Sequence, residues 1–198
     1  MSKKSHISLA KFLVENMQTP SMHKHWKAFY LGSILPDCKP SFLTQRHEFE
    51  GTFEMVREQI YALSTDADLI CTNTRAYMRQ LGEVVHYLAD YFTFPHNESY
   101  DGNLKDHCSY ENDLKFRLRE YVASREAARE RLRACRLETA EEIARFIQEA
   151  HAEYVSRKRS VEEDCEYIVR ICYQVTRAIL ELLSTTLEMD MKKRLCLA

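Results

Sequence analysis

Two histidine–carboxylate pairs stand close together in the segments HYLADYFTFPH and HCSYE. His86 and Asp90 are four residues apart, as are His107 and Glu111, so each pair would project from one face of a helix. His96 follows a proline between the pairs, and the full pattern reads H-x3-D-x5-H-x10-H-x3-E. Imidazole and carboxylate groups in this arrangement suit zinc, although ligand chemistry alone does not exclude iron or manganese.

The first pair lies in an otherwise apolar segment. Leu81, Val84 and Leu88 are expected on the opposite side of the same helix, and aromatic residues widen its apolar surface. A helix that is apolar on most sides is usually buried, and a buried carboxylate is costly unless it is paired or binds a metal. The segment therefore favours a metal site. The alternative is a coincidence of polar helix faces around a hydrogen-bonded core histidine.

Three weaker candidates lie upstream: His6, Asp37 in the segment GSILPD, and His47 in TQRHEF. Each of them alone is more often a surface or structural residue than a ligand, and an aspartate after a proline is also a common turn former. His23 and His25 are expected at the surface, although either could take the place of His6. These upstream residues join a metal site only if the chain folds back onto the central pairs.

Helices must form the scaffold that brings these residues together. The chain has only four Gly and four Pro, shows no strand pair or hairpin turn, and carries capping boxes at Thr139 with Glu142 and at Ser160 with Glu163. The expected helices cover about residues 5–17, 44–63, 73–94, 104–135 and the two segments after the capping boxes, with an irregular stretch at 19–42. The sequence thus predicts an all-α fold of about six or seven helices in a single domain over residues 1–198.

The bulk composition argues against several classes of protein. Of 198 residues, 45% are hydrophobic and 29% are charged, which fits a globular chain with a core, and the net charge of −2 gives no general attraction to nucleic acid or anionic membranes. No apolar run is typical of a signal peptide or long enough to cross a membrane. The seven cysteines form no C-x2-C pair, so we expect reduced core thiols and a cytoplasmic location.

Taken in order, the segments GSILPD, HYLADYFTFPH and HCSYE, with His47 between the first two, resemble the metal motifs of the zinc-dependent phospholipase C family. That family includes bacterial phosphatidylcholine-hydrolysing enzymes and the catalytic domains of alpha-toxins. The resemblance covers about the first 115 residues, and the remaining residues carry no motif. It implies an all-helical fold and a hydrolase that uses two or three zinc ions to cleave a phosphodiester.

The resemblance also implies a role for each candidate residue. The ligands of the two principal zinc sites would be His47, His86 and Asp90 for one ion and His96, His107 and Glu111 for the other. Asp90 would also reach toward a third zinc, with His6 as its histidine ligand. Asp37 would be the general base, or the residue that orients the attacking water. The surplus positive charge of such a centre would attract a phosphodiester.

The sequence departs from the family at its first residue. Secreted members use the amino group and carbonyl of an N-terminal tryptophan on the third metal, whereas this chain begins with Met1 and its one tryptophan, Trp26, is internal. We also expect no counterpart of the C-terminal lipid-binding domain of the toxins. The number of zinc ions therefore stays open between two and three.

Several functions are compatible with these residues. The first is a zinc-dependent hydrolase of a phospholipid or of a soluble phosphodiester, and a nucleic acid fits less well because the composition is mildly acidic. The second is a helical module that binds metal without turnover. The third, a ferritin-like di-iron bundle, fits least well, because such bundles use Glu-x-x-His motifs and more carboxylates. The sequence does not determine the oligomeric state.

Overall fold

The computed structural model describes residues 1–38, 48–133, 136–156 and 160–196. Every regular element in these ranges is helical, which confirms the predicted all-α class. The longer helices are α1 (Lys3–Asn16), α3 (Trp26–Ile34), α4 (Phe49–Thr65), α5 (Ala67–Tyr91), α6 (Leu104–Val122), α8 (Ala140–Val155) and α9 (Val161–Cys196). The shorter elements are α2 (Pro20–Lys24), α7 (Arg125–Arg129) and the 3-10 helices η1 (Pro36–Cys38), η3 (Phe94–His96) and η4 (Glu130–Leu132).

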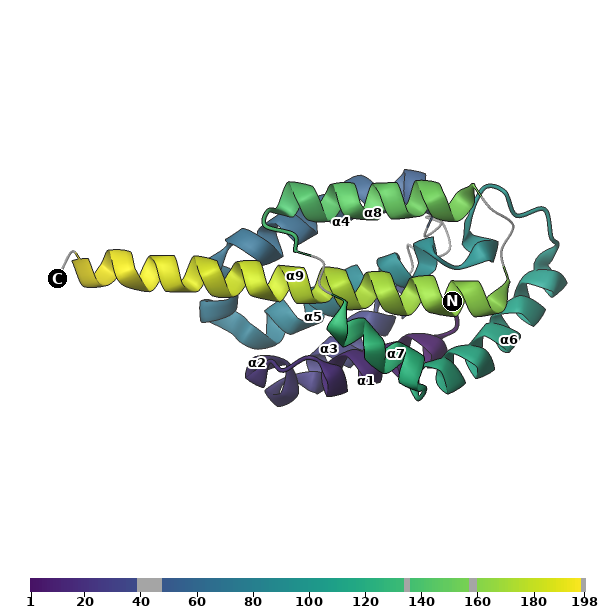
Figure 1. Cartoon of the computed structure of the whole chain (residues 1–198), viewed down its shortest axis with the longest axis horizontal. Helices are drawn as coiled ribbons and strands as arrows, with labels where there is room; N and C mark the ends of the chain where they lie inside the picture. Colours follow the sequence, from purple (N-terminus) through teal and green to yellow (C-terminus); the bar gives the residue numbers. More distant parts are fainter. Residues whose placement is uncertain (39–47, 134–135, 157–159, 197–198) are drawn as a thin grey trace.

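Helix α9 runs the length of the molecule, and its C-terminal end extends beyond the other helices (Figure 1). Helices α4, α5, α6 and α8 all pack against it, while α1 packs against α3 and α6. Apolar side chains along one side of α9 face these neighbours. Those that are fully buried include Cys165, Ile168, Cys172, Val175 and Ile179. No helix among the described residues combines the length and the apolar character that crossing a membrane requires.

Local capping signals set the start of several helices. The side chain of Ser2 accepts a hydrogen bond from the Ser5 backbone N–H at the start of α1. At α9 both arms of the predicted capping box form, between Ser160 and Glu163. At α8 the Thr139 hydroxyl accepts from the Glu142 N–H as predicted, but the Glu142 carboxylate reaches the preceding backbone N–H, at Glu138. Each cap satisfies donors that a helix start leaves unpaired.

The structure differs from the predicted helices in several places. The helix expected over residues 104–135 ends at Val122, and the side chain of Ser124 then caps the separate helix α7. Within the stretch expected to be irregular, Pro20 occupies the first turn of α2, where its missing N–H is harmless, and α3 follows. The described residues therefore contain nine α-helices rather than six or seven.

Helix α5 carries the first histidine–carboxylate pair. We expected it to begin at Asn73, but it begins at Ala67 after the capping residue Asp66, and Asn73 marks a kink with φ −152° and ψ 80°. Beyond the kink, buried residues occupy most sides of the helix, as the apolar sequence predicted. The pair is therefore enclosed by packed side chains.

Helices α3 and α5 cross with their backbones in direct contact. A Cβ atom added at Gly82 would collide with the Phe29 carbonyl oxygen, and one added at Gly32 would collide with the Arg79 carbonyl oxygen. Only glycine permits such an approach, because it has no Cβ. This crossing brings the C-terminal end of α3 beside the centre of α5.

The five cysteines whose side chains the structure describes are unpaired, but they do not all lie in the core. Cys165 and Cys172 are buried free thiols, in agreement with the prediction. Cys38, Cys71 and Cys108 are also free but exposed, which corrects the expectation that the set would be core residues. The core thiols occupy α9, where small apolar residues fit against neighbouring helices.

Candidate metal centre

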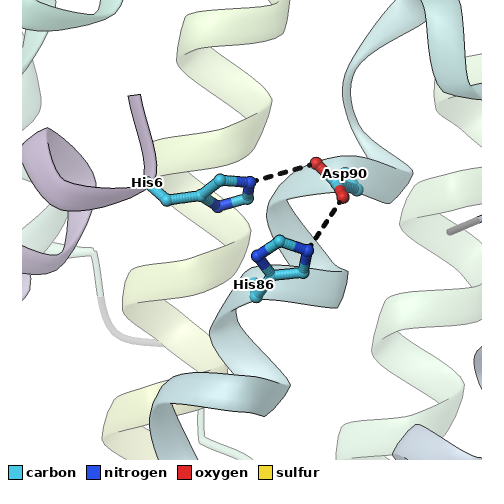
Figure 2. A group of neighbouring side chains, drawn as sticks. All are labelled: His6, His86 and Asp90. Atoms are coloured by element: carbon cyan, nitrogen blue, oxygen red, sulfur yellow. Dashed lines mark ion pairs between the residues drawn. The ribbon is translucent and has the colours of Figure 1, made fainter. Parts of the chain in front are cut away.

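One cluster is fully buried between α1 and α5. The carboxylate of Asp90 faces the edges of two imidazoles, with Oδ1 3.4 Å from Nε2 of His6 and Oδ2 3.2 Å from Nε2 of His86 (Figure 2). The two rings stack with centroids 4.0 Å apart. Potential ligand atoms from all three residues lie within 4.8 Å of one another. We call this group the buried cluster.

The two ring nitrogens of His6 make no hydrogen bond to the described residues and could act as metal ligands. Its side chain is buried, and within the described part of the chain neither ring nitrogen has a hydrogen-bond partner. Burial, together with the nearby His86, lowers the pKa of His6 to about 3, so its ring is neutral at physiological pH. A buried neutral imidazole with no hydrogen bond is costly, and a divalent cation would satisfy it. This position excludes the alternative of a solvent-facing His6.

Helix α3 fixes the orientation of His86. The Nδ1–H of its ring donates to the Ser33 carbonyl oxygen at 2.9 Å, and its Nε2 atom faces Asp90. Asp37, in η1 just beyond α3, places its Oδ1 3.6 Å from the same Nε2. The crossing of α3 and α5 at Gly32 and Gly82 thus places Ser33 and Asp37 beside His86.

A second cluster, which we call the open cluster, lies between η3 and α6. The Oε1 atom of Glu111 is 3.3 Å from Nε2 of His96 and 3.3 Å from Nε2 of His107. These side chains keep 15% (His96), 30% (His107) and 23% (Glu111) of their surface exposed. Burial alone would raise the pKa of Glu111, but the hydrogen bond to His96 and the Met1 ammonium hold it at about 2.

The amino group of Met1 lies between the two clusters. Its nitrogen is 2.7 Å from Oδ1 of Asp90, 2.9 Å from Nε2 of His96 and 3.2 Å from Oε1 of Glu111. Burial alone would lower the pKa of this group, but Asp90 and Glu111 raise it. Burial would likewise raise the pKa of Asp90, but the Met1 ammonium, His96 and His86 hold it well below its usual range. The carboxylates of Asp90 and Glu111 therefore strongly favour a positive charge at the position of the Met1 nitrogen.

Sequence reasoning gave Met1 no role. It considered only whether the first side chain was tryptophan, whereas the atom that enters the centre belongs to the backbone and is shared by every residue type. The available signal was the position of His6 in the second turn of the first helix, which places the preceding residues beside the same cluster.

The structure brings together seven of the eight residues singled out in the sequence: His6, Asp37, His86, Asp90, His96, His107 and Glu111. The eighth, His47, lies outside the described residues. His23 is exposed and His25 half-buried, close to expectation. His151 is buried, with its ring stacked on Phe49.

Comparison with known proteins agrees with this geometry. A family model described as zinc dependent phospholipase C matches residues 5–161, a range that includes every candidate side chain above and ends at the first residue of α9. Searches of curated proteins and of solved structures returned no significant match. Because the family model covers more than half of the sequence, the chain belongs to the zinc-dependent phospholipase C family.

Proposed function

We propose that the protein is a zinc-dependent phosphodiester hydrolase of the phospholipase C type, which acts on a phospholipid or a related phosphodiester. The observation that carries the proposal is the junction of the two clusters at Asp90. Its Oδ2 atom lies 3.2 Å from His86 and 3.8 Å from Nδ1 of His96, so one carboxylate serves both groups. Adjoining nitrogen and oxygen donor sets of this kind suit a centre of more than one zinc ion.

We assign the candidate ligands to two zinc ions. His6, His86 and Asp90 would hold one zinc, and the unpaired ring nitrogens of His6 support that assignment. The open cluster would hold the other. His47 stays a proposed ligand on the strength of the family resemblance, and His6 joins His86 in one group instead of serving a separate third ion.

Bound zinc would supply Lewis-acid activation of a water molecule and neutralise charge on the phosphate oxygens. Asp37 stands beside the buried cluster, with its Oδ1 atom 3.6 Å from Nε2 of His86. Its carboxylate would orient the attacking water and accept its proton. As the water oxygen forms its bond to phosphorus, the ester bond breaks and the departing alcohol takes up a proton.

The open cluster is the side from which a substrate would enter. His107 and Glu111 retain exposed surface, whereas the buried cluster has almost none. A phosphodiester anion would therefore meet the centre beside Glu111 and His96. With a phospholipid, the products would be diacylglycerol and a phosphorylated head group.

The test combines metal analysis with turnover. Purified protein is assayed for zinc content and for hydrolysis of a panel of phosphodiesters that includes a chromogenic phosphocholine ester. We expect Asp37→Asn to retain zinc but lose turnover, and His96→Ala to lose zinc as well as turnover. Exposed His23, replaced by alanine, is the matched control and should change neither measurement.

Three results would contradict the proposal. Protein that binds zinc tightly but hydrolyses no member of the panel would be a metal-binding helical module instead. Full turnover in Asp37→Asn would remove the proposed base from the mechanism. An iron content in place of zinc would point to a different chemistry altogether.

A further inference from the structure

A buried carboxylate outside the metal centre connects elements that carry the candidate ligands. Asp164, in the first turn of α9, is fully buried. Its Oδ2 accepts from the Phe94 backbone N–H at 2.9 Å and from the Tyr110 hydroxyl at 2.7 Å, and its Oδ1 accepts from the Tyr154 hydroxyl at 2.6 Å. A buried carboxylate needs such donors, and charge-assisted hydrogen bonds of this length are strong.

Two of these donors belong to the elements that form the open cluster. Phe94 is the first residue of η3, which ends at His96. Tyr110 directly precedes Glu111 on α6. A single oxygen atom, Oδ2 of Asp164, therefore ties the η3 turn to α6, and these are the two elements whose separation sets the distance between His96 and Glu111.

The third donor provides an internal comparison. Tyr154 lies on α8, which carries none of the candidate ligands. Its hydrogen bond to the same carboxylate is as short as that of Tyr110. Both bonds hold α9 to a neighbouring helix, but only the Tyr110 bond reaches a helix of the open cluster.

The other end of η3 is held as well. The Asn97 amide Nδ2 donates to the carbonyl oxygens of Tyr91 and Thr93, and the Nε2–H of His151 donates to Oδ1 of Asn97 at 2.9 Å. His96 thus sits between two anchored residues, Phe94 and Asn97. Asn97 fixes η3 to the end of α5, and Asp164 links η3 to α6 in addition to the direct contacts of Phe94 with Tyr110 and of His96 with Glu111.

We propose that Asp164 is a positioning residue for the open cluster, which holds His96 and Glu111 at the separation that one zinc ion requires. The inference rests on the proposed zinc function. It adds a contribution from α9, because Asp164 lies beyond residue 161, where the family match ends. Partners that orient metal ligands commonly change metal affinity by ~10–100-fold when they are removed.

The experiment compares Tyr110→Phe with Tyr154→Phe, each of which removes one hydroxyl from Asp164. Metal-free proteins are titrated with zinc against a chromophoric chelator, and with Co²⁺ while the visible absorption is recorded. The zinc ion that disappears in Glu111→Gln identifies the open cluster. We expect Tyr110→Phe to weaken that ion ~10-fold or more and to alter the Co²⁺ spectrum. Tyr154→Phe should lower the Tm by a similar amount and leave both metal readouts unchanged.

Equal effects of the two tyrosine variants on zinc affinity, or no effect of Tyr110→Phe, would reduce Asp164 to a packing residue and overturn the inference. Asp164→Asn serves as a further variant, but the tyrosine pair decides the question even if that variant does not fold. Metal titration needs no turnover, so wild-type protein that binds zinc without hydrolysis removes the proposed activity alone. Wild-type protein that binds no zinc removes both proposals.

Discussion

The buried cluster and the open cluster offer similar donor atoms in contrasting surroundings. His6, His86 and Asp90 come from two helices and have almost no exposed surface. His107 and Glu111 come from α6 and remain partly exposed. The buried cluster depends on the backbone contact between α3 and α5. The open cluster depends on the 3-10 helix η3, which hydrogen bonds from Phe94 to Asp164 and from Asn97 to Tyr91 hold in place.

This contrast separates two tasks that a hydrolytic centre must combine. A buried donor set holds an ion in fixed geometry, because its side chains cannot rearrange and water cannot compete. An exposed donor set can exchange water for substrate, which catalysis requires. We therefore expect the ion of the buried cluster to be retained for longer and the ion of the open cluster to exchange more readily.

The largest effect should follow from Asp90→Asn, because this change affects both clusters at once. An amide is neutral, so it removes the negative charge that faces His6, His86 and the Met1 ammonium. We expect zinc to be lost from both clusters and hydrolysis to fall below detection, as measured by metal analysis and phosphodiester assay. The exposed Asp101, replaced by asparagine, is the control. Retention of one full zinc equivalent in Asp90→Asn would show that the clusters are independent.

Metal removal should resolve the two clusters in time. During incubation with a chelator, we expect zinc to leave in a fast phase from the open cluster and in a slow phase from the buried cluster. Activity should disappear in the fast phase, whereas most of the fall in Tm should accompany the slow phase, because ligand binding stabilises the folded state. Serial samples for zinc content, turnover and thermal unfolding measure this. A single phase in all three would contradict the distinction drawn from burial.

Two glycines test the backbone contact that supports the buried cluster. Gly82→Ala would force α3 and α5 apart, at a cost of ~1–3 kcal/mol in the free energy of unfolding, and would move Ser33 from His86. Gly51→Ala, on α4, meets no atom within 4 Å and should stabilise the protein by ~0.5–1 kcal/mol. Denaturant unfolding and zinc affinity measure both. Equal stability of the two variants would mean that the helices adjust freely.

A last effect, confined to acidic pH, concerns His151, which supports the open cluster through Asn97. Burial lowers the pKa of His151 to about 4 from its ordinary 6.5. Between these values the unfolded chain binds a proton at this position that the folded chain does not, so stability falls as pH drops from 6.5 toward 4. Each pKa unit corresponds to ~1.4 kcal/mol.

We therefore expect His151→Gln to show a shallower loss of stability over that pH range than the wild type, when both are metal-free and unfolded by urea. Above pH 7 the two proteins should differ by the packing of the ring on Phe49 and by the hydrogen bond to Asn97. Parallel stability curves across the whole range would mean that His151 titrates normally in the folded protein.

The sequence predicted the helical class and the placement of two histidine–carboxylate pairs, because both depend on local spacing. Four-residue separation alone placed His86 with Asp90 and His107 with Glu111. It could not predict that α3 crosses α5 at two glycines, since that contact lies between segments far apart in the chain. Nor could it identify Asp164, which stands among acidic residues at a helix start and resembles a solvent-facing side chain.

The break after Val122 shows a similar limit. The sequence pattern continued past this residue, but a serine cap ended one helix and began another, and capping depends on backbone angles that composition does not specify. Conversely, the capping box at Ser160 and Glu163 formed as predicted, because both of its partners lie within one turn.

The placement of His6 against Asp90 also bears on how the chain is assembled. Helix α1 is made first, but 14 residues form a marginal helix without tertiary contacts. Its histidine must wait until α5 has been synthesised and has packed against α3. Contacts between segments so distant in sequence are slow to form, so an ion at the buried cluster would be captured late in folding, and the amount of zinc retained would report on the fraction of chains that have completed it.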